Sequence, residues 1–182
     1  MHSNPLSPLR SLLQQRRQRL LVILSGQVSW QSAQLRNLWQ AHERVLWLGV
    51  PRPEQTQALL AADIEPLEEA KLTHYLGQEA DGVIIDVRHG LSANALGIVS
   101  GLLRGGGLLI LLTPDRSDWA TLPNPHHARF LNTPYRLADA LPYFTQHLMQ
   151  QWQQASQRHE LLWLEQIAPQ SNALSALLAA LR

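Results

Sequence analysis

Four short, continuously apolar runs, each separated from the next by segments with helical or turn patterns, constrain the fold most strongly. The runs are Arg19–Ser25, Arg44–Val50, Gly82–Val87 and Leu108–Leu112. A strand that is covered on both faces reads as an unbroken apolar run rather than as an alternation. Strands that alternate with helices predict a parallel sheet with helical crossovers. We therefore expect an α/β fold: a three-layer, Rossmann-like domain with a mainly parallel sheet of four to six strands.

The remaining segments carry helical or turn patterns. We expect helices at Leu6–Gln18, Ser29–Ala41, Pro53–Ala62, Leu67–Leu76, Ala93–Arg104, Leu137–Gln157 (kinked near Pro142) and Ser171–Leu181. Two more short strands are expected at Ala128–Leu131 and Leu161–Ile167. The proline-rich stretch Pro114–His127 predicts a long surface loop. We expect a single domain over residues 1–182, in which residues 137–182 form a C-terminal helical extension that packs on the rest.

Composition narrows the class of protein. The chain has no cysteine, which excludes disulfides, thiolate nucleophiles and cysteine-based zinc sites. No apolar run approaches the roughly 20 residues of a membrane span, and no signal-peptide core precedes Arg19. We expect a cytoplasmic protein without membrane contact.

The charges are unevenly distributed. Met1–Arg52 holds seven arginines against Glu43 alone, whereas Pro53–Asp86 holds Lys71 against eight acidic residues. Such a dipole would steer an RNA or dock a partner domain. The alternative is that these charged residues only face solvent and form ion pairs within the chain.

The first candidate site is the end of the third apolar run. Asp86, Arg88, His89 and Gly90 lie within five positions there, at the carboxyl edge where open α/β sheets bind ligands, and Asp115 comes just after the next strand. These residues predict a site that binds a small molecule or phosphate, or one that carries acid–base chemistry. The alternative is that Asp86 caps the following turn and pairs with Arg88.

The glycine triplet Gly105–Gly107 lies at the opposite, N-terminal edge of the sheet. We interpret it as a helix C-cap followed by a tight turn rather than as a phosphate loop. Neither GxGxxG nor GxxxxGK[ST] is present, so the sequence contains no P-loop. His126 and His127 are adjacent but have no accompanying metal-binding pattern, so we expect no metal site.

The second candidate site is a group of basic side chains around the end of the first helix. Arg10, Arg16, Arg17 and Arg19 cluster there, and arginine clusters bind nucleic-acid phosphates without sequence preference. The alternative is that they stabilise the helix C-terminus. Trp119, in the irregular loop, is the tryptophan we would test for contact with a base or a partner domain.

Several segments, in this order, carry a family resemblance. Arg19–Gly26 (RLLVILSG) with Trp30, the block Leu76–Pro114, and the pair Arg129-Phe130 are similar to the N-terminal domain of bacterial tRNA(Met) cytidine acetyltransferases. The resemblance covers roughly Arg10 to Ile167. It implies a Rossmann-like domain preceding a RecD-like helicase module and a GNAT acetyltransferase module.

The family's activity is N4-acetylation of the wobble cytidine of elongator tRNA(Met), with acetyl-CoA, ATP or GTP, and magnesium. The residues that carry this chemistry have no counterpart in this sequence, so we expect no catalytic residue and no cofactor in this chain. The resemblance implies a non-catalytic accessory domain, excised or free-standing, that packs on the helicase module and binds tRNA. Two alternatives remain: a small nucleotide- or phosphate-binding protein that uses Asp86–Gly90, and an oligomerising domain that pairs through its Gln-rich helix.

Overall fold

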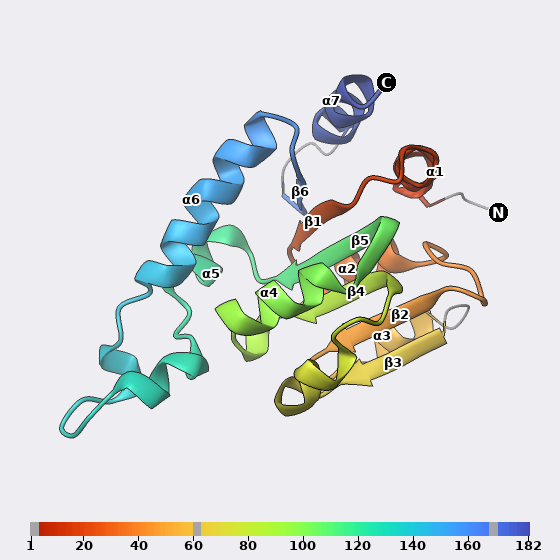
Figure 1. Ribbon diagram of the computed structural model, residues 1–182. Coiled ribbons are helices and arrows are strands. Elements are labelled where there is room, and N and C mark those ends of the chain that lie inside the picture. The colour runs from red at the N-terminus through yellow and green to blue at the C-terminus, as the bar shows by residue number, and fades with distance from the viewer. Residues whose placement is uncertain (1–3, 60–62, 168–170) are drawn as a thin grey trace.

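The computed structural model describes residues 4–59, 63–167 and 171–182. Its centre is a six-stranded, entirely parallel sheet in the order β3-β2-β4-β5-β1-β6 (Figure 1). The strands are β1 (Leu20–Ser25), β2 (Arg44–Leu48), β3 (Asp63–Leu67), β4 (Ala80–Asp86), β5 (Leu103–Thr113) and β6 (Leu162–Glu165). This confirms the predicted fold class.

Helices cover both faces of the sheet and so make three layers. The face whose apolar cluster includes Leu9 and Leu177 is covered by α1 (Ser7–Arg16), α2 (Val28–Leu35), α3 (Pro53–Ala58) and α7 (Ser171–Ala180). The face whose cluster includes Leu72 and Val99 is covered by the 3₁₀ helix η1 (Glu69–Tyr75), α4 (Ala93–Gly101), α5 (Arg116–Thr121) and α6 (Tyr143–Gln157). Three short 3₁₀ turns complete the described structure: η2 (Val87–His89), η3 (Pro125–Phe130) and η4 (Leu137–Asp139).

The central strands are buried on both faces, as their unbroken apolar sequences require. Neighbouring side chains of β4 belong to different clusters, because successive residues of a strand point to opposite faces: Ile84 lies in one cluster and Ile85 in the other. Every residue of β4 is buried. The carboxyl ends of these strands therefore meet at one edge, from which side chains reach both faces.

Three expected elements differ in the structure. The segment before Leu67 forms the edge strand β3, and η1 replaces the expected helix Leu67–Leu76. Pro66 is tolerated in β3 because β3 pairs only with β2, so the missing N–H faces no partner strand. Ala128–Leu131 is not a strand: most of it belongs to η3, outside the sheet.

The expected Gln-rich helix also has different bounds. Helix α6 begins after Pro142 instead of running through it as a kinked helix. It packs on the sheet through Met149 and neighbouring apolar residues, so its apolar side is used within the chain. Residues 137–182 contribute strand β6, paired with β1, as well as α6 and α7.

The glycine triplet lies within β5, because α4 already ends at Gly101. It lies at the N-terminal edge of the sheet, as expected, but it does not cap the helix. Gly106 has φ +92°, and a Cβ there would lie 2.8 Å from the Cα of Gln14 in α1. The glycines therefore let β5 approach α1 closely.

A second close approach gives a stability prediction. A Cβ at Gly82 would lie 2.5 Å from Cζ2 of the buried Trp39 indole. We expect Gly82→Ala to lower the free energy of unfolding by about 1–3 kcal/mol, measured by urea denaturation. Gly97→Ala in α4 is the matched control, since no described atom lies within 4 Å of the added Cβ. It should leave stability unchanged or raise it by up to about 1 kcal/mol. Equal effects of the two substitutions would contradict the packing.

Within the described residues, no helix combines the length and the hydrophobicity that a membrane crossing requires.

Candidate functional site

Asp86 ends β4 at the carboxyl edge and is 2% exposed. Its Oδ1 accepts a hydrogen bond from the backbone N–H of Arg88 at 3.0 Å and another from Arg88 Nη1 at 3.2 Å. Asp86 therefore caps η2 and pairs with Arg88. The capping and pairing that the sequence offered as the alternative to a ligand site are therefore present. Both contacts use Oδ1, one of the two carboxylate oxygens.

Arg88 joins the ends of three neighbouring strands. Besides Asp86, its Nη2 donates to Gly26 O at 2.8 Å, to Gln31 Oε1 at 2.9 Å and to Thr113 O at 3.4 Å. These acceptors belong to segments that follow or end β1 and β5 and to helix α2. Both terminal nitrogens of the guanidinium are thus engaged by protein oxygens, and a phosphate that bound them would have to displace these oxygens.

The other predicted members of this site do not converge on one cavity. Gly90, at φ +100°, approaches Asn124 so closely that a Cβ would lie 2.8 Å from Asn124 Oδ1. Asp115 precedes α5 and lines a separate hollow of about 250 Å³ beside Arg116 and Glu165. The side chain of His89 lies outside the described residues.

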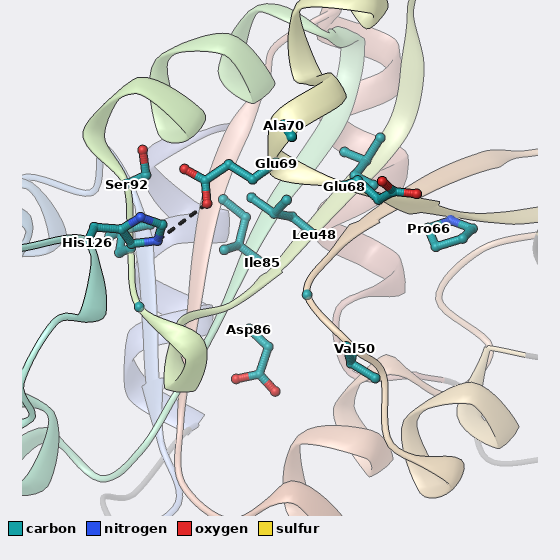
Figure 2. Close-up of a pocket in the computed structure, with 14 residues that line it drawn as sticks. Leu48, Val50, Pro66, Glu68, Glu69, Ala70, Ile85, Asp86, Ser92 and His126 are labelled. Carbon is teal, nitrogen blue, oxygen red and sulfur yellow. Dashed lines mark ion pairs between the residues drawn. The ribbon is translucent and has the colours of Figure 1, made fainter. Parts of the chain in front are cut away.

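A larger pocket of about 490 Å³ lies at the carboxyl edge around the ends of β2, β3 and β4 (Figure 2). Its walls come from segments far apart in the sequence. Of the lining residues, only Asp86 and Gly90 were predicted as site residues. The lining residues are Leu48, Gly49, Val50, Pro66, Leu67, Glu68, Glu69, Ala70, Ile85, Asp86, Gly90, Leu91, Ser92 and His126.

The polar groups of this pocket are mostly hydrogen-bond acceptors. Glu69 Oε2 lies 3.4 Å from His126 Nε2, the contact drawn in Figure 2. Glu68 pairs with Lys71 at 2.8 Å, and Lys71 does not line the pocket. The second oxygen of Asp86, Oδ2, is buried and has no hydrogen-bond partner among the described residues. No signal in the sequence indicated Glu68, Glu69 or His126, because strand order alone brings them together.

At the opposite edge, the structure removes Arg10 from the predicted basic cluster. Arg10 is 6% exposed and forms a two-pronged ion pair with the buried Glu43, with Arg10 Nη1 donating to Glu43 Oε2 at 2.8 Å. Burial by itself would raise the pKa of Glu43, but the Arg10 hydrogen bonds and the Gln40 N–H outweigh it, so that pKa lies below its ordinary value. Arg10 is thus a core residue rather than an RNA ligand.

The other predicted arginines are exposed and gain neighbours from elsewhere in the chain. Arg16 Nη2 donates to Arg182 O at 2.7 Å, and Gly106 N donates to Gln18 O at 3.0 Å, which brings the start of β5 beside the end of α1. We call the resulting surface the basic edge. Its exposed side chains are Arg16, Arg17, Arg19, Arg104 and Arg182.

Trp119 is not accessible for the contact predicted from the sequence. It is 3% exposed within α5, and its ring stacks on Trp152 of α6 with centroids 6.0 Å apart. Its role in the structure is to join α5 to α6 over the sheet.

The part of the chain that the structure describes contains no group of three or more His, Asp or Glu side chains that could hold a metal ion.

Comparison with known proteins assigns a family to most of the chain. The family model described as "tRNA(Met) cytidine acetyltransferase TmcA, N-terminal" matches residues 1–166. A relative named tRNA(Met) cytidine acetyltransferase TmcA from Nitrosococcus halophilus is 35% identical over 133 residues, which is 72% of this chain and 17% of the relative.

Relatives with the same name occur in other organisms. The Yersinia pestis protein is 34% identical over 151 residues, covering 82% of this chain and 20% of that protein. The Haloferax volcanii protein is 38% identical over 78 residues, which cover 43% of this chain and 10% of that protein. The chain thus spans about a fifth of the length of the curated relatives it matches over most of its own length.

Proposed function

The chain belongs to the family of TmcA N-terminal domains, and on this premise we propose that it is a non-catalytic accessory domain for acetylation of tRNA(Met). In this proposal the domain binds tRNA through the basic edge and packs on a helicase module. Acetyl-CoA, nucleotide and magnesium would be bound by other modules, and the domain would work in the cytoplasm with them.

The engagement of the polar groups at the carboxyl edge supports a non-catalytic role. Asp86 and Arg88 were the residues best placed for acid–base or phosphate chemistry. Each is committed to contacts that hold strand ends together. A general base or a phosphate ligand needs a group free to meet a substrate.

The observation that carries the RNA part of the proposal is the exposed basic edge. Five arginine side chains gather there from both ends of the chain and from the start of β5. Two nearby carboxylates are withdrawn: Glu43 is buried with Arg10, and Asp81 is 6% exposed and pairs with Arg104 at 3.2 Å. Glu79, just before β4, is exposed at the same edge. Arginine side chains facing water with few competing carboxylates suit contact with RNA phosphates.

Exposed apolar side chains support the packing part of the proposal. The segment around η3 and η4 projects from the body of the domain (Figure 1). Phe130, Tyr135, Leu141 and Tyr143 in this segment are 59–70% exposed. Large apolar side chains gathered on one projecting segment are typical of a surface that packs on another domain.

The RNA part is tested by the triple substitution Arg16→Gln, Arg17→Gln and Arg19→Gln. We expect tRNA affinity, measured by filter binding at several salt concentrations, to fall about tenfold or more and the salt slope to decrease by about one per lost phosphate contact. Arg158→Gln is the matched control, because Arg158 is exposed but pairs with Glu160 at the end of α6. Unchanged binding by the triple variant would contradict the proposed site.

A further inference from the structure

We propose that the pocket between η3 and the start of α4 binds a small phosphate monoester that carries an aromatic ring. We call it the η3 pocket. Its volume is about 300 Å³, and its walls include Ser92, His126, His127, Arg129, Phe130 and Phe144. This function is additional to RNA binding at the basic edge and does not depend on it.

Buried hydrogen bonds hold the two walls of the η3 pocket together. Asn124 is 6% exposed and caps η3, because its Oδ1 accepts from His126 N at 3.1 Å. Its Nδ2 donates to Leu91 O at 2.8 Å, and Leu91 directly precedes Ser92, the N-cap of α4. One buried amide therefore fixes η3 against the start of α4, so the pocket is formed before a ligand arrives.

The charged and polar side chains of the η3 pocket favour an anion. His126, His127 and Arg129 line it, and no Asp or Glu of the described chain is among its lining residues. Arg129 is exposed and has no carboxylate partner within the described residues, and its guanidinium lies 4.7 Å from the ring centroid of Phe130. An arginine and two imidazoles offer the several N–H donors that phosphate oxygens accept.

The carboxylate of Glu69 belongs to the neighbouring, larger pocket. It contacts His126 Nε2 at 3.4 Å from that side, as Figure 2 shows, and it does not line the η3 pocket. His126 lines both pockets and so separates the acidic one from the basic one. A phosphate in the η3 pocket is therefore not bound among carboxylates.

The start of α4 adds backbone donors to these side chains. Ser92 Oγ accepts from Ala95 N at 3.2 Å, and Leu96 N donates to Ser92 O at 2.9 Å. The N–H groups of Ala93 and Asn94 precede these bonds and have no partner within the helix. Because Ala93 lines the pocket, these N–H groups supplement the arginine and the histidines.

The aromatic walls and the size select the rest of the ligand. Phe130 and Phe144 line the pocket, and the ring of His127 lies edge-on to Phe144 with centroids 6.3 Å apart. A volume of about 300 Å³ is at the lower end of small-molecule sites. Tyr135 and Tyr143, which we propose for packing on another domain, do not line this pocket. A phosphate joined to a compact ring thus matches both the donors and the aromatic walls.

Titration calorimetry with three probes tests the two halves of the site. The probes are phenyl phosphate, inorganic phosphate and benzyl alcohol. We expect phenyl phosphate to bind with a dissociation constant of about 1 mM or lower, and each of the other two probes to bind at least about fivefold more weakly. No measurable binding of phenyl phosphate, or no preference for it over either of the other probes, overturns the proposal.

Variants assign the binding to the η3 pocket. Arg129→Gln changes an exposed side chain and should weaken phenyl phosphate about tenfold, because a charge-assisted hydrogen bond is lost. Arg136→Gln is the matched control, since Arg136 is an exposed arginine of the same projecting segment that does not line the pocket. It should leave binding unchanged. Equal affinities of the two variants overturn the assignment.

The exposed arginines of the basic edge are the other place where a phosphate could bind. Amide NMR signals of the ¹⁵N-labelled chain during titration with phenyl phosphate separate the two sites. We expect the largest shifts at Ala93, Asn94 and His127, with little change at Arg17 and Gly106. The largest shifts at the basic edge would overturn the η3 pocket and leave the proposed RNA binding intact.

Discussion

Replacing Arg88 with methionine is expected to lower the free energy of unfolding by about 3–5 kcal/mol. The guanidinium joins Asp86 at the end of β4 to Gly26 O, Thr113 O and Gln31. Methionine keeps the aliphatic length but leaves the buried carboxylate of Asp86 without its cation, and removes the donor to Gly26 O and Gln31 Oε1. Urea denaturation followed by circular dichroism measures the loss.

Arg88→Lys separates geometry from charge. Lysine retains the positive charge but not the planar fork, in which Nη1 reaches Asp86 and Nη2 reaches Gly26 O and Gln31 Oε1. We expect a loss between that of Arg88→Met and zero. If Arg88→Met unfolds at the same urea concentration as the unsubstituted chain, the Arg88 side chain does not hold the strand ends together and is free to bind a ligand.

The second large effect is expected at the buried pair of Arg10 and Glu43. Arg10→Met should also cost about 3–5 kcal/mol, because it leaves the Glu43 carboxylate buried without its cation and removes the donor to Leu38 O. The double variant Arg10→Met with Glu43→Met should recover most of this loss. Arg44→Gln, which breaks a half-exposed pair with Glu65, should cost about 1 kcal/mol or less.

The pH dependence of stability is a second test of the pair between Arg10 and Glu43. Burial raises the pKa of Glu43, but Arg10 lowers it more, so the folded pKa lies below the ordinary value of 4.5. The stability that this carboxylate contributes is therefore present above pH 4.5 and is lost as the pH falls through the folded pKa. Stability measured from pH 7 down to about pH 3 should fall more in the parent chain than in Arg10→Met. Parallel curves would contradict the pairing.

The sequence predicted the inner part of the fold because the central strands are buried on both faces. A short, unbroken apolar run such as Gly82–Val87 is typical of a strand covered on both faces. Strand β3 was missed because an edge strand carries polar residues and can hold Pro66. The glycine triplet was assigned to the correct edge but the wrong element, since glycines that admit a neighbouring helix look like glycines that end one.

The candidate sites were less predictable because burial and strand order decide them. Arg10 and Trp119 look like surface ligands in the sequence, but each meets a buried partner from a distant segment, Glu43 and Trp152. The pocket residues Glu69 and His126 are 57 positions apart and meet only through the placement of η1 and η3 around the sheet. No local pattern encodes such a meeting.

The central claim is that RNA contacts the basic edge and not the carboxyl edge. It is tested most directly by following backbone amide NMR signals of the ¹⁵N-labelled domain during titration with tRNA(Met). We predict the largest shifts at the basic edge, around Arg17, Arg19 and Gly106, with little change at Gly90 and Ser92. Shifts confined to Gly90 and Ser92, or no shifts at saturating tRNA, would contradict the account.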